Sequence, residues 1–348
     1  MPNHLVSEAF TPIKTAIVGY GQSGELSHAY GIQANTEFEI VAVCDLSPQR
    51  RQFAQESIGC PAYADHRELL DSKAEIELAA IVTRSDTHCQ VACDLLDAGV
   101  NVLITKPWAV NTKEADLLIR AQLGSGKLIF PWIPMYWSPE YCKIKQLVEE
   151  NAIGRVFTIR RYIAQFSKRE DWQTELKFGG GYLNNWGAHI VQPLLDLAGS
   201  PVTRVGGHLQ QVINGGDGDD NFLALLEFEN GILGIAEYAQ ATEGLPSFLV
   251  QGTQGTIVSD GETITLVQKD PASTEAPQRN EFPVEGKRFG DEADIYRDVA
   301  ATLRQGSPFR ASLEDAYQGT RVLDAIREAH HKKSFVSDFL SLNSKLET

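Results

Sequence analysis

The chain has 348 residues, of which 43% are apolar and 22% are charged, and its formal net charge at pH 7 is −15. This length exceeds what one hydrophobic core usually fills, so we expect two domains. The acidic balance excludes nucleic acid as a partner, because such a partner requires a basic face. No stretch of 18 consecutive apolar residues occurs, so no membrane span and no membrane partner are expected.

The start of the chain and its cysteines favour a cytoplasmic protein. Residues 1–11 contain neither the basic nor the apolar segment of a secretory signal. The five cysteines are sparse and odd in number, which is typical of a reducing compartment. Cys89 and Cys93, next to His88, have the spacing of a partial metal site, but small buried side chains on one helix face explain them better, and no metal is predicted.

In the first part of the chain, short apolar strands alternate with amphipathic helices. This alternation of strands and helices is typical of a doubly wound parallel sheet, and it predicts a Rossmann dinucleotide-binding domain over residues 1–132. The expected strands are 13–19, 38–44, 78–83, 100–105 and 128–132, and the expected helices include 48–57, 87–98 and 112–123.

The second part of the chain, residues 133–348, predicts an α+β domain for substrate binding and oligomerisation, built on a large and mostly antiparallel sheet. Asn230-Gly231 is a strong hairpin signal between two of its strands. The expected strands are 155–166, 204–213, 221–229, 232–240, 248–251, 255–259 and 263–267, with a polar loop at 269–280 and helices at 139–150, 292–305 and 313–331.

A glycine-rich turn follows the first strand and points to a dinucleotide. Gly19 permits the tight turn, Gly21 lets backbone N–H groups reach a pyrophosphate, and Gly24 lets the next helix pack close to the strand. Asp45 follows 21 residues after Gly24, at the end of the second strand, where a carboxylate binds ribose hydroxyls. The cofactor-binding residues predicted from this unit are Gly19, Tyr20, Gly21, Gln22, Ser23, Gly24 and Asp45.

The cofactor preference follows from the same acid. Asp45 would repel a 2′-phosphate, which favours NAD over NADP. Arg50 and Arg51 lie close behind and weaken that preference, so NADP remains open.

Two further segments contain residue types that can move protons. Lys106 ends an apolar strand, at the edge of a parallel sheet where ligands bind. After Phe178 come three glycines, Gly179 to Gly181, which are expected to let the backbone approach a ligand, and the chain then continues as a helix with Asn185 and His189 on one face. A helical histidine alone is more often structural than catalytic.

With these segments, the chain resembles the Gfo/Idh/MocA oxidoreductases over about residues 13–336. Thr83 to His88 match the family's T-P-x-x-x-H, residues 105–107 match its E-K-P, and the run from Gly179 to His189 matches its G-G-G…D-x-G-x-H. The resemblance implies NAD(P)-dependent oxidation or reduction of a carbinol on a sugar, inositol or related polyol. It also implies catalytic roles for Lys106 and His189, and cofactor contacts from Thr83, His88 and Lys106.

The chain departs from this pattern at three positions. Thr105 replaces the family's glutamate, Arg84 its proline and Asn185 its catalytic aspartate. Asn185 can neither accept a proton nor stabilise an imidazolium by charge. We therefore expect the pKa of His189 to be lower than in relatives that keep the acid.

The predicted reaction is a hydride transfer between nicotinamide and a ring carbon. His189 exchanges the hydroxyl proton, Lys106 stabilises developing charge on the same oxygen, and Asn185 orients the hydroxyl. Arg169 and Trp172 are predicted to contact the substrate beside these three residues, because an indole face suits a sugar ring and a guanidinium suits hydroxyls or a carboxylate. Tyr136 and Trp137 are further candidates for the wall of the cleft.

Two other functions remain open: an NAD-dependent glycosidase that uses transient oxidation, and a non-catalytic NAD or sugar sensor. Asp217 begins a run that resembles a calcium loop, but Phe222 and Phe228 stand where that loop needs glycine and glutamate, so we expect a solvated turn. The family resemblance implies a homodimer or homotetramer formed through the exposed face of the second sheet.

Overall fold

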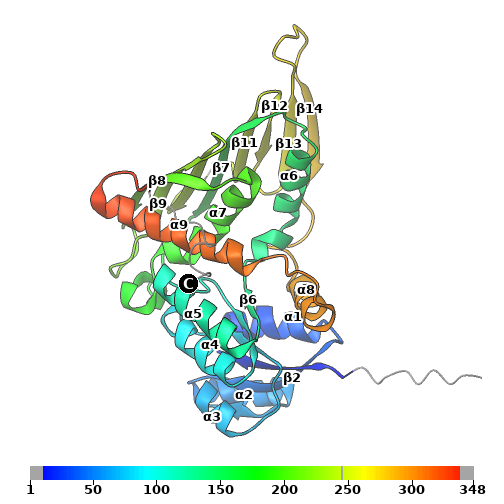
Figure 1. Ribbon diagram of the computed structural model, residues 1–348, viewed down its shortest axis with the longest axis vertical. Coiled ribbons are helices and arrows are strands. Elements are labelled where there is room, and N and C mark those ends of the chain that lie inside the picture. The colour runs from blue at the N-terminus through cyan, green and yellow to red at the C-terminus, as the bar shows by residue number, and fades with distance from the viewer. Residues whose placement is uncertain (1–10, 244–245, 338–348) are drawn as a thin grey trace, which may run out of the picture.

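The computed structural model describes residues 11–243 and 246–337, which form two β-sheets with helices around and between them (Figure 1). The first sheet has six parallel strands in the order β3-β2-β1-β4-β5-β6. This is the order of a Rossmann fold, and it confirms the predicted fold class. The strands are β1 (Ile13–Val18), β2 (Phe38–Cys44), β3 (Ala62–Tyr63), β4 (Leu78–Ile81), β5 (Asn101–Ile104) and β6 (Ile129–Pro131).

Helices cross over between these strands, as parallel pairing requires. Their ends follow local rules: the Ser47 hydroxyl accepts the Arg50 N–H at the start of α2, and Gly59 ends it in the left-handed conformation. The helices are α1 (Tyr30–Gln33), which continues a π-helical segment (Gly24–Ala29), then α2 (Pro48–Ile58), α3 (His66–Asp71), α4 (His88–Asp97) and α5 (Thr112–Ser125).

The second sheet has eight strands in the order β14-β13-β12-β11-β7-β10-β9-β8, and every pair is antiparallel except β10 with β7. The mostly antiparallel sheet is therefore confirmed. Gly231, in the left-handed conformation, turns the chain between β9 and β10, as the hairpin signal predicts. The strands are β7 (Val156–Gln165), β8 (Val202–Gln210), β9 (Asn221–Phe228), β10 (Leu233–Gln240), β11 (Phe248–Gly252), β12 (Gly255–Ser259), β13 (Thr263–Gln268) and β14 (Gln278–Pro283).

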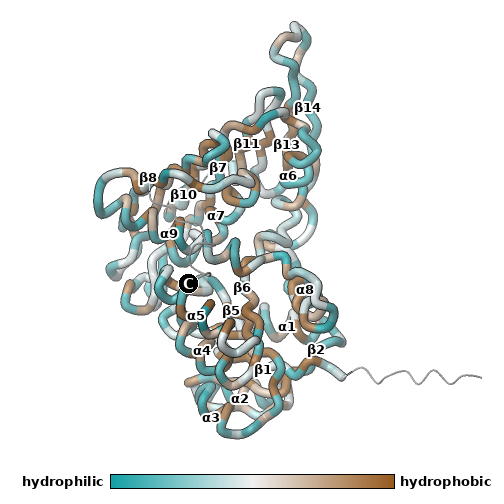
Figure 2. The backbone as a smooth tube through the Cα atoms, in the orientation of Figure 1, coloured by the Kyte–Doolittle hydropathy of each residue, from teal (hydrophilic) through white to brown (hydrophobic). Residues whose placement is uncertain are grey.

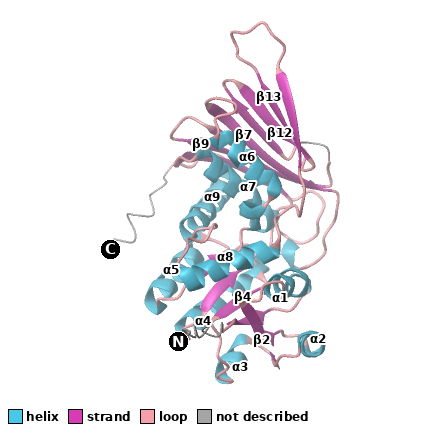
Figure 3. Ribbon diagram, turned by 90° about the vertical axis from the view of Figure 1, so that its right-hand side faces the viewer, coloured by secondary structure: helices cyan, strands magenta, loops and turns pink. Residues whose placement is uncertain are grey.

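Helices line one side of this second sheet (Figure 3). They are α6 (Pro139–Glu149), α7 (Tyr182–Ala198) and α9 (Leu313–Lys332). The buried and exposed positions alternate along β9, with Phe222, Ala224 and Leu226 facing the helices. Apolar residues are concentrated along the strands of both sheets (Figure 2). None of the described helices has the length and the apolar run needed to cross a bilayer.

One late helix packs against the nucleotide-binding half of the molecule. α8 (Glu292–Gln305) lies beside α1 (Figure 1), so close that a Cβ on Gly31 would lie 2.7 Å from the Tyr296 ring. The Tyr296 hydroxyl also lies 2.8 Å from His28 Nδ1. A helix from the predicted second domain thus packs against the predicted first domain. The boundary between residues 132 and 133 stays a prediction.

Candidate active site

A large cavity opens where the parallel strands end. Its volume is about 1270 Å³, and its wall includes the residues that follow β1, β2, β4 and β5, the beginning of α7, and Phe289 before α8. Ligand cavities commonly measure roughly 300–1,000 Å³. This cavity therefore has room for a dinucleotide and a small second molecule.

The glycine-rich turn after β1 is too tight for side chains. Gly19 has a φ of +100°, and a Cβ there would lie 2.6 Å from the Val82 carbonyl oxygen. A Cβ on Gly24 would lie 2.3 Å from the Gly19 carbonyl oxygen. Gly21 lies in the cavity wall next to Arg50. A Cβ on Gly21 would lie 3.1 Å from the Arg50 guanidinium. This narrow turn, leading into a helix, fits a pyrophosphate, as the sequence predicts.

Asp45 is held firmly at the edge of the same cavity. One carboxylate oxygen accepts the Tyr20 N–H and the other accepts the Ser47 N–H, both at 2.8 Å. A guanidinium nitrogen of Arg50 lies 3.7 Å from the first oxygen. Each carboxylate oxygen keeps a free lone pair, so the group can also accept hydrogen bonds from a ribose. Tyr20 thus acts here through its backbone N–H.

Lys106, after β5, reaches across the cavity to α7. Its Nζ donates a hydrogen bond to the backbone oxygen of Asn185 at 3.0 Å and another to the side-chain oxygen of Asn185. Burial, followed by the positive charge of Arg169, lowers the pKa of Lys106 to about 8. Both bonding partners of Lys106 are neutral atoms, so no carboxylate offsets its charge by direct contact.

His189 lies one turn further along α7, in the wall of the same cavity. Its ring packs against the rings of Trp186 and Phe289, at centroid distances of 5.5 and 5.0 Å, and its Nδ1 has no hydrogen-bond partner in the described structure. Burial holds the pKa of His189 well below 6.5, and the charges of Lys106, Arg161 and Arg288 lower it further. The ring is therefore neutral near pH 7, with a free lone pair.

Comparisons with known proteins agree with this geometry. The model of an oxidoreductase family with an NAD-binding Rossmann fold matches residues 13–131, and the model of a Gfo/Idh/MocA C-terminal domain matches residues 141–258. The chain belongs to the Gfo/Idh/MocA family. As a member of this family it is an oxidoreductase, and a nicotinamide adenine dinucleotide is its cofactor.

Named relatives of this Gfo/Idh/MocA protein are distant but cover most of its length. Levoglucosan dehydrogenase of Pseudarthrobacter phenanthrenivorans is 23% identical over 322 residues, covering 78% of this chain and 82% of that protein. The NADP-dependent scyllo-inositol 2-dehydrogenase of Bacillus subtilis is 21% identical over 351 residues, covering 92% and 94%. An NAD-binding protein from Listeria innocua has a similar structure, with a TM-score of 0.84, 25% identity and coverage of 94% of this chain and 97% of that one.

The structure explains how this Gfo/Idh/MocA chain accommodates Arg84 in place of proline. The backbone of Arg84 has φ −68° and ψ 148°, which is a conformation that proline also adopts. Its guanidinium binds Asp86 at 3.0 Å and lies 4.1 Å from the centre of the Phe178 ring. The substitution therefore keeps the turn and adds a link to the segment before α7.

His88 lies behind the cavity wall. Its ring nitrogens lie 2.9 Å from the Pro107 oxygen and 3.0 Å from the Thr83 oxygen, and the ring is buried. The neutral ring donates its one N–H to one of these two oxygens and packs against the other, so His88 lies between the strand end at Lys106 and the strand end at Thr83, which does line the cavity. Its predicted contact with the cofactor stays a prediction, and the visible role is to position the backbone.

The three glycines before α7 approach the protein itself. A Cβ on Gly179 would lie 2.9 Å from Ser85 Cβ, and one on Gly180 would lie 2.6 Å from the Glu175 oxygen. Gly181, with a φ of +91°, would place a Cβ 2.6 Å from an Asp219 carboxylate oxygen. We expected these glycines to let the backbone approach a ligand. They do line the cavity, but close packing within the protein already requires glycine at each position.

The turn at residues 217–220 caps the helix that contains Asn185 and His189, which corrects the expectation of a solvated turn. Asp219 accepts the Leu183 N–H at 2.8 Å through its side chain and the Tyr182 N–H at 2.8 Å through its backbone oxygen. Asp220 is fully buried, and its carboxylate accepts three N–H groups, those of Val212, Ile213 and Asn214, each at 2.7 Å. No calcium-like arrangement results.

The predicted substrate contacts differ in their placement. Trp172 lines the cavity, whereas Arg169 forms an ion pair with Asp171 at 2.5 Å and acts on Lys106 through its charge. Tyr136 and Trp137 were wrong as candidates for the wall of the cleft. Trp137 is buried and donates from its indole to Asp298 at 2.9 Å, and Tyr136 belongs to a separate cavity.

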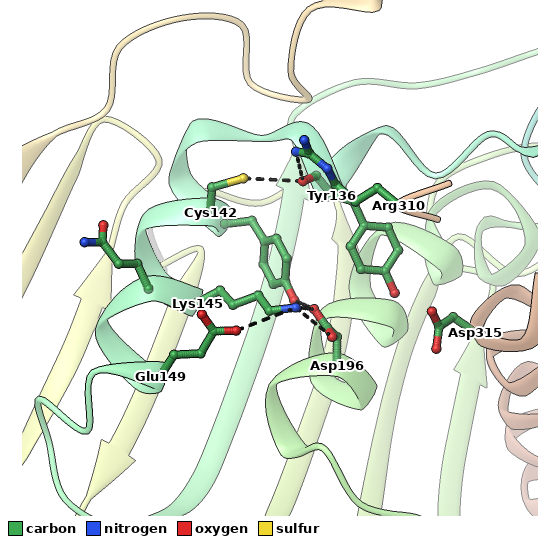
Figure 4. A pocket seen from close by; sticks show the side chains of 9 residues that line it. Tyr136, Cys142, Lys145, Glu149, Asp196, Arg310 and Asp315 are labelled. Atoms are coloured by element: carbon green, nitrogen blue, oxygen red, sulfur yellow. Dashed lines mark hydrogen bonds and ion pairs between the residues drawn. The ribbon is translucent and has the colours of Figure 1, made fainter. Parts of the chain in front are cut away.

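This second cavity has a volume of about 250 Å³ and lies between α6 and the end of α7 (Figure 4). Lys145 donates to both carboxylate oxygens of Asp196, at 3.0 and 2.8 Å, and the Tyr141 hydroxyl donates to the same carboxylate. These bonds fix the last turns of α7 to α6. The residues that line this cavity therefore help to hold in place the helix that contains Asn185 and His189.

Proposed function

We propose that the protein is a dehydrogenase that transfers a hydride between NAD and a carbinol or keto carbon of a sugar, inositol or related polyol. The observation that carries this proposal is the shared cavity: Lys106 and His189 lie in the same space as the glycine turn. A lysine and a neutral histidine near a dinucleotide site form a proton-handling pair.

When bound, the nicotinamide accepts or supplies the hydride. His189 uses its free lone pair to accept the hydroxyl proton during oxidation, because its neutral ring is the base available near pH 7. Lys106 donates a hydrogen bond to the same oxygen and stabilises the developing alkoxide. Asn185 holds the Lys106 ammonium through its two oxygens, so that the ammonium points into the cavity.

The relatives support a carbohydrate or polyol substrate, since two of them are named for levoglucosan and scyllo-inositol. Trp172 and Trp186 in the cavity wall offer indole faces suited to a sugar ring. Asp45 supports NAD over NADP, while Arg50, beside Asp45 and Gly21, offers a cation that a 2′-phosphate would use.

The test is nicotinamide absorbance with purified protein, NAD or NADP, and a panel of sugars, inositols and sugar acids. Formation of the reduced cofactor with one substrate class supports the dehydrogenase and names its chemistry. Tight cofactor binding with no net turnover would contradict it and favour a glycosidase that uses transient oxidation, or a sensor. Retention of both Lys106 and His189 argues against a sensor, which needs no proton-handling pair.

Association into a homodimer or homotetramer is part of the same proposal. The side of the second sheet opposite α6, α7 and α9 presents apolar side chains, among them Leu223, which is 50% exposed, and the half-buried Leu225 and Ile235. The Arg160–Glu237 and Arg204–Glu227 ion pairs lie on the same face, so it combines apolar and charged groups, as interfaces between subunits commonly do.

A cytoplasmic location is likewise proposed. All five cysteines are free thiols in the structure, and burial raises the pKa of Cys44 and Cys89 to about 12. Unreactive buried thiols of this kind fit a reducing compartment.

A further inference from the structure

The end of the cavity near His189 has an excess of positive charge. Lys106, Arg161, Arg169 and Arg288 act electrostatically on Lys106 or His189, and no carboxylate of the described structure contributes to the shift of either pKa. The usual acid of the family would stand at position 185, where this chain has Asn185.

Two of the four cations are neutralised locally. Arg169 binds Asp171 at 2.5 Å. Arg161 lies 3.7 Å from Glu140, with both side chains almost completely buried, and donates to the Ser247 backbone oxygen at 2.9 Å. The carboxylates of Asp171 and Glu140 therefore neutralise Arg169 and Arg161, and neither of them pairs with Lys106 or Arg288.

Lys106 and Arg288 keep their charge. Lys106 binds only the neutral oxygens of Asn185. Arg288 is exposed, forms no ion pair with any residue in the described ranges, and lies 5.3 Å from the centre of the Phe289 ring, which in turn lies against His189. Of these four cations, Lys106 and Arg288 are therefore the two that have no carboxylate bonded to them in the described structure.

We infer that the substrate carries a carboxylate, as a sugar acid does, and that Arg288 binds this group beside the Phe289 ring while the reacting hydroxyl meets Lys106 and His189. This inference rests on the proposed dehydrogenase function and narrows its substrate class. A guanidinium matches the two oxygens of a carboxylate in a bidentate pair. One unpaired guanidinium suits a monoanion better than the two charges of a phosphate.

Arg288 acts here as a specificity residue. The rings of Trp186 and Phe289 lie beside His189, and Arg288 is exposed next to Phe289, outside the cavity wall, where it can meet a charged group at the open end of a bound substrate. A neutral polyol would leave the two cations without a counter-ion. The replacement of the family's aspartate by Asn185 is thereby explained, since a fixed carboxylate at that position would repel the one on the substrate.

The experiment compares three forms of each probe: D-glucuronate and D-galacturonate, their methyl esters, and the parent hexoses, with kcat/KM measured from nicotinamide absorbance. We expect at least one acid to exceed both its ester and its hexose by about tenfold or more, the range of one charge-assisted hydrogen bond. Equal or better turnover of the neutral forms would overturn the inference and leave the dehydrogenase standing. No turnover of any probe, with cofactor bound, would overturn both.

Two variants locate the effect. Arg288→Gln should reduce the ratio of kcat/KM between acid and ester by about tenfold or more. Arg279→Gln removes the same charge from exposed strand β14 and should leave the ratio unchanged. Calorimetric titration of the protein–NADH complex with the preferred acid gives a second readout, in which Arg288→Gln weakens binding by a similar factor. Equal behaviour of the two variants would contradict the assignment to Arg288.

Discussion

At the scale of single residues, Asn185 changes the chemistry of its neighbours. Both Lys106 and His189 lie in a cavity where burial disfavours charge, and Asn185 supplies hydrogen-bond oxygens but no negative charge. Consequently Lys106 titrates near pH 8, while His189 stays neutral. The comparison of the His189 pKa with that of relatives that keep the acid stays a prediction, and burial, the largest cause of the lowering in this chain, could not be read from the motif.

The pH dependence of oxidation follows from these shifts. Lys106 is cationic below its pKa of about 8 and neutral above it, so the rate should fall above about pH 8 as the alkoxide loses its cation. Since the pKa of His189 lies well below 6.5, no acidic limb is expected near that pH. A profile of kcat against pH from 5 to 10 checks both limbs, and a flat alkaline side would contradict the role of Lys106.

Asn185→Asp should reverse this effect. A carboxylate beside Lys106 and His189 favours their charged forms and raises both pKa values. The alkaline limb of the kcat profile should therefore move upward, and any acidic limb should move toward neutral pH. Asn184→Asp, one residue earlier on α7 and bonded to Arg327, is the matched control, and an equal displacement there would argue against a local effect.

Lys106→Ala should reduce kcat by about 10²–10⁴-fold, because it removes the group that stabilises charge on the reacting oxygen. NAD affinity, measured by fluorescence titration, should change little, since the glycine turn and Asp45 are untouched. A variant with activity within tenfold of the wild type would refute the assignment.

At the scale of elements, helix α7 is the piece on which the site depends. Its start is capped by Asp219 and its end is fixed by Asp196, and a Cβ on Gly187 would lie 2.5 Å from Leu323 of α9. The helix face with the proposed catalytic residues thus has support at both ends and along its back. Small shifts of this helix would separate His189 from Lys106.

Asp219→Ala should lower the free energy of unfolding by about 1 kcal/mol, the usual cost of losing a helix cap. It should also lower kcat, because α7 begins close to Asn185. Urea unfolding and steady-state kinetics measure the two effects. Asp217→Ala, in the same turn but bonded to Leu176 outside α7, should affect kcat less, and the reverse order would argue against a capping role.

The regular elements could be predicted from hydrophobic period and turn residues, since β2 has the expected bounds and most helices end within two residues of expectation. The sequence missed β3, which has only two residues, α3, and β14, whose exposed polar residues lack an alternating pattern and overlap the predicted loop. Lys106 and His189 were accessible because motifs mark them. Arg288 and Phe289 could not be predicted as site residues, because their polar segment comes close to α7 only in the folded structure.

At the scale of the whole molecule, the open face of the second sheet is the proposed interface between copies of the chain. Leu223→Glu puts a charge on this face and should convert an oligomer into a species of 38.3 kDa, measured by light scattering after size exclusion. Leu117→Glu, an equally exposed leucine on α5, should leave the mass unchanged. A wild-type protein that is already monomeric would contradict this interface.

The contact between α8 and α1 also bears on how the protein is made. A nascent chain on the ribosome presents its nucleotide-binding strands first, but the Tyr296 ring that covers Gly31 and His28 emerges only after both sheets have been synthesised. Domains commonly fold in order of synthesis. Here the early half stays partly uncovered until α8 is synthesised, so the wall of the cofactor cavity is completed only after translation has passed the second sheet.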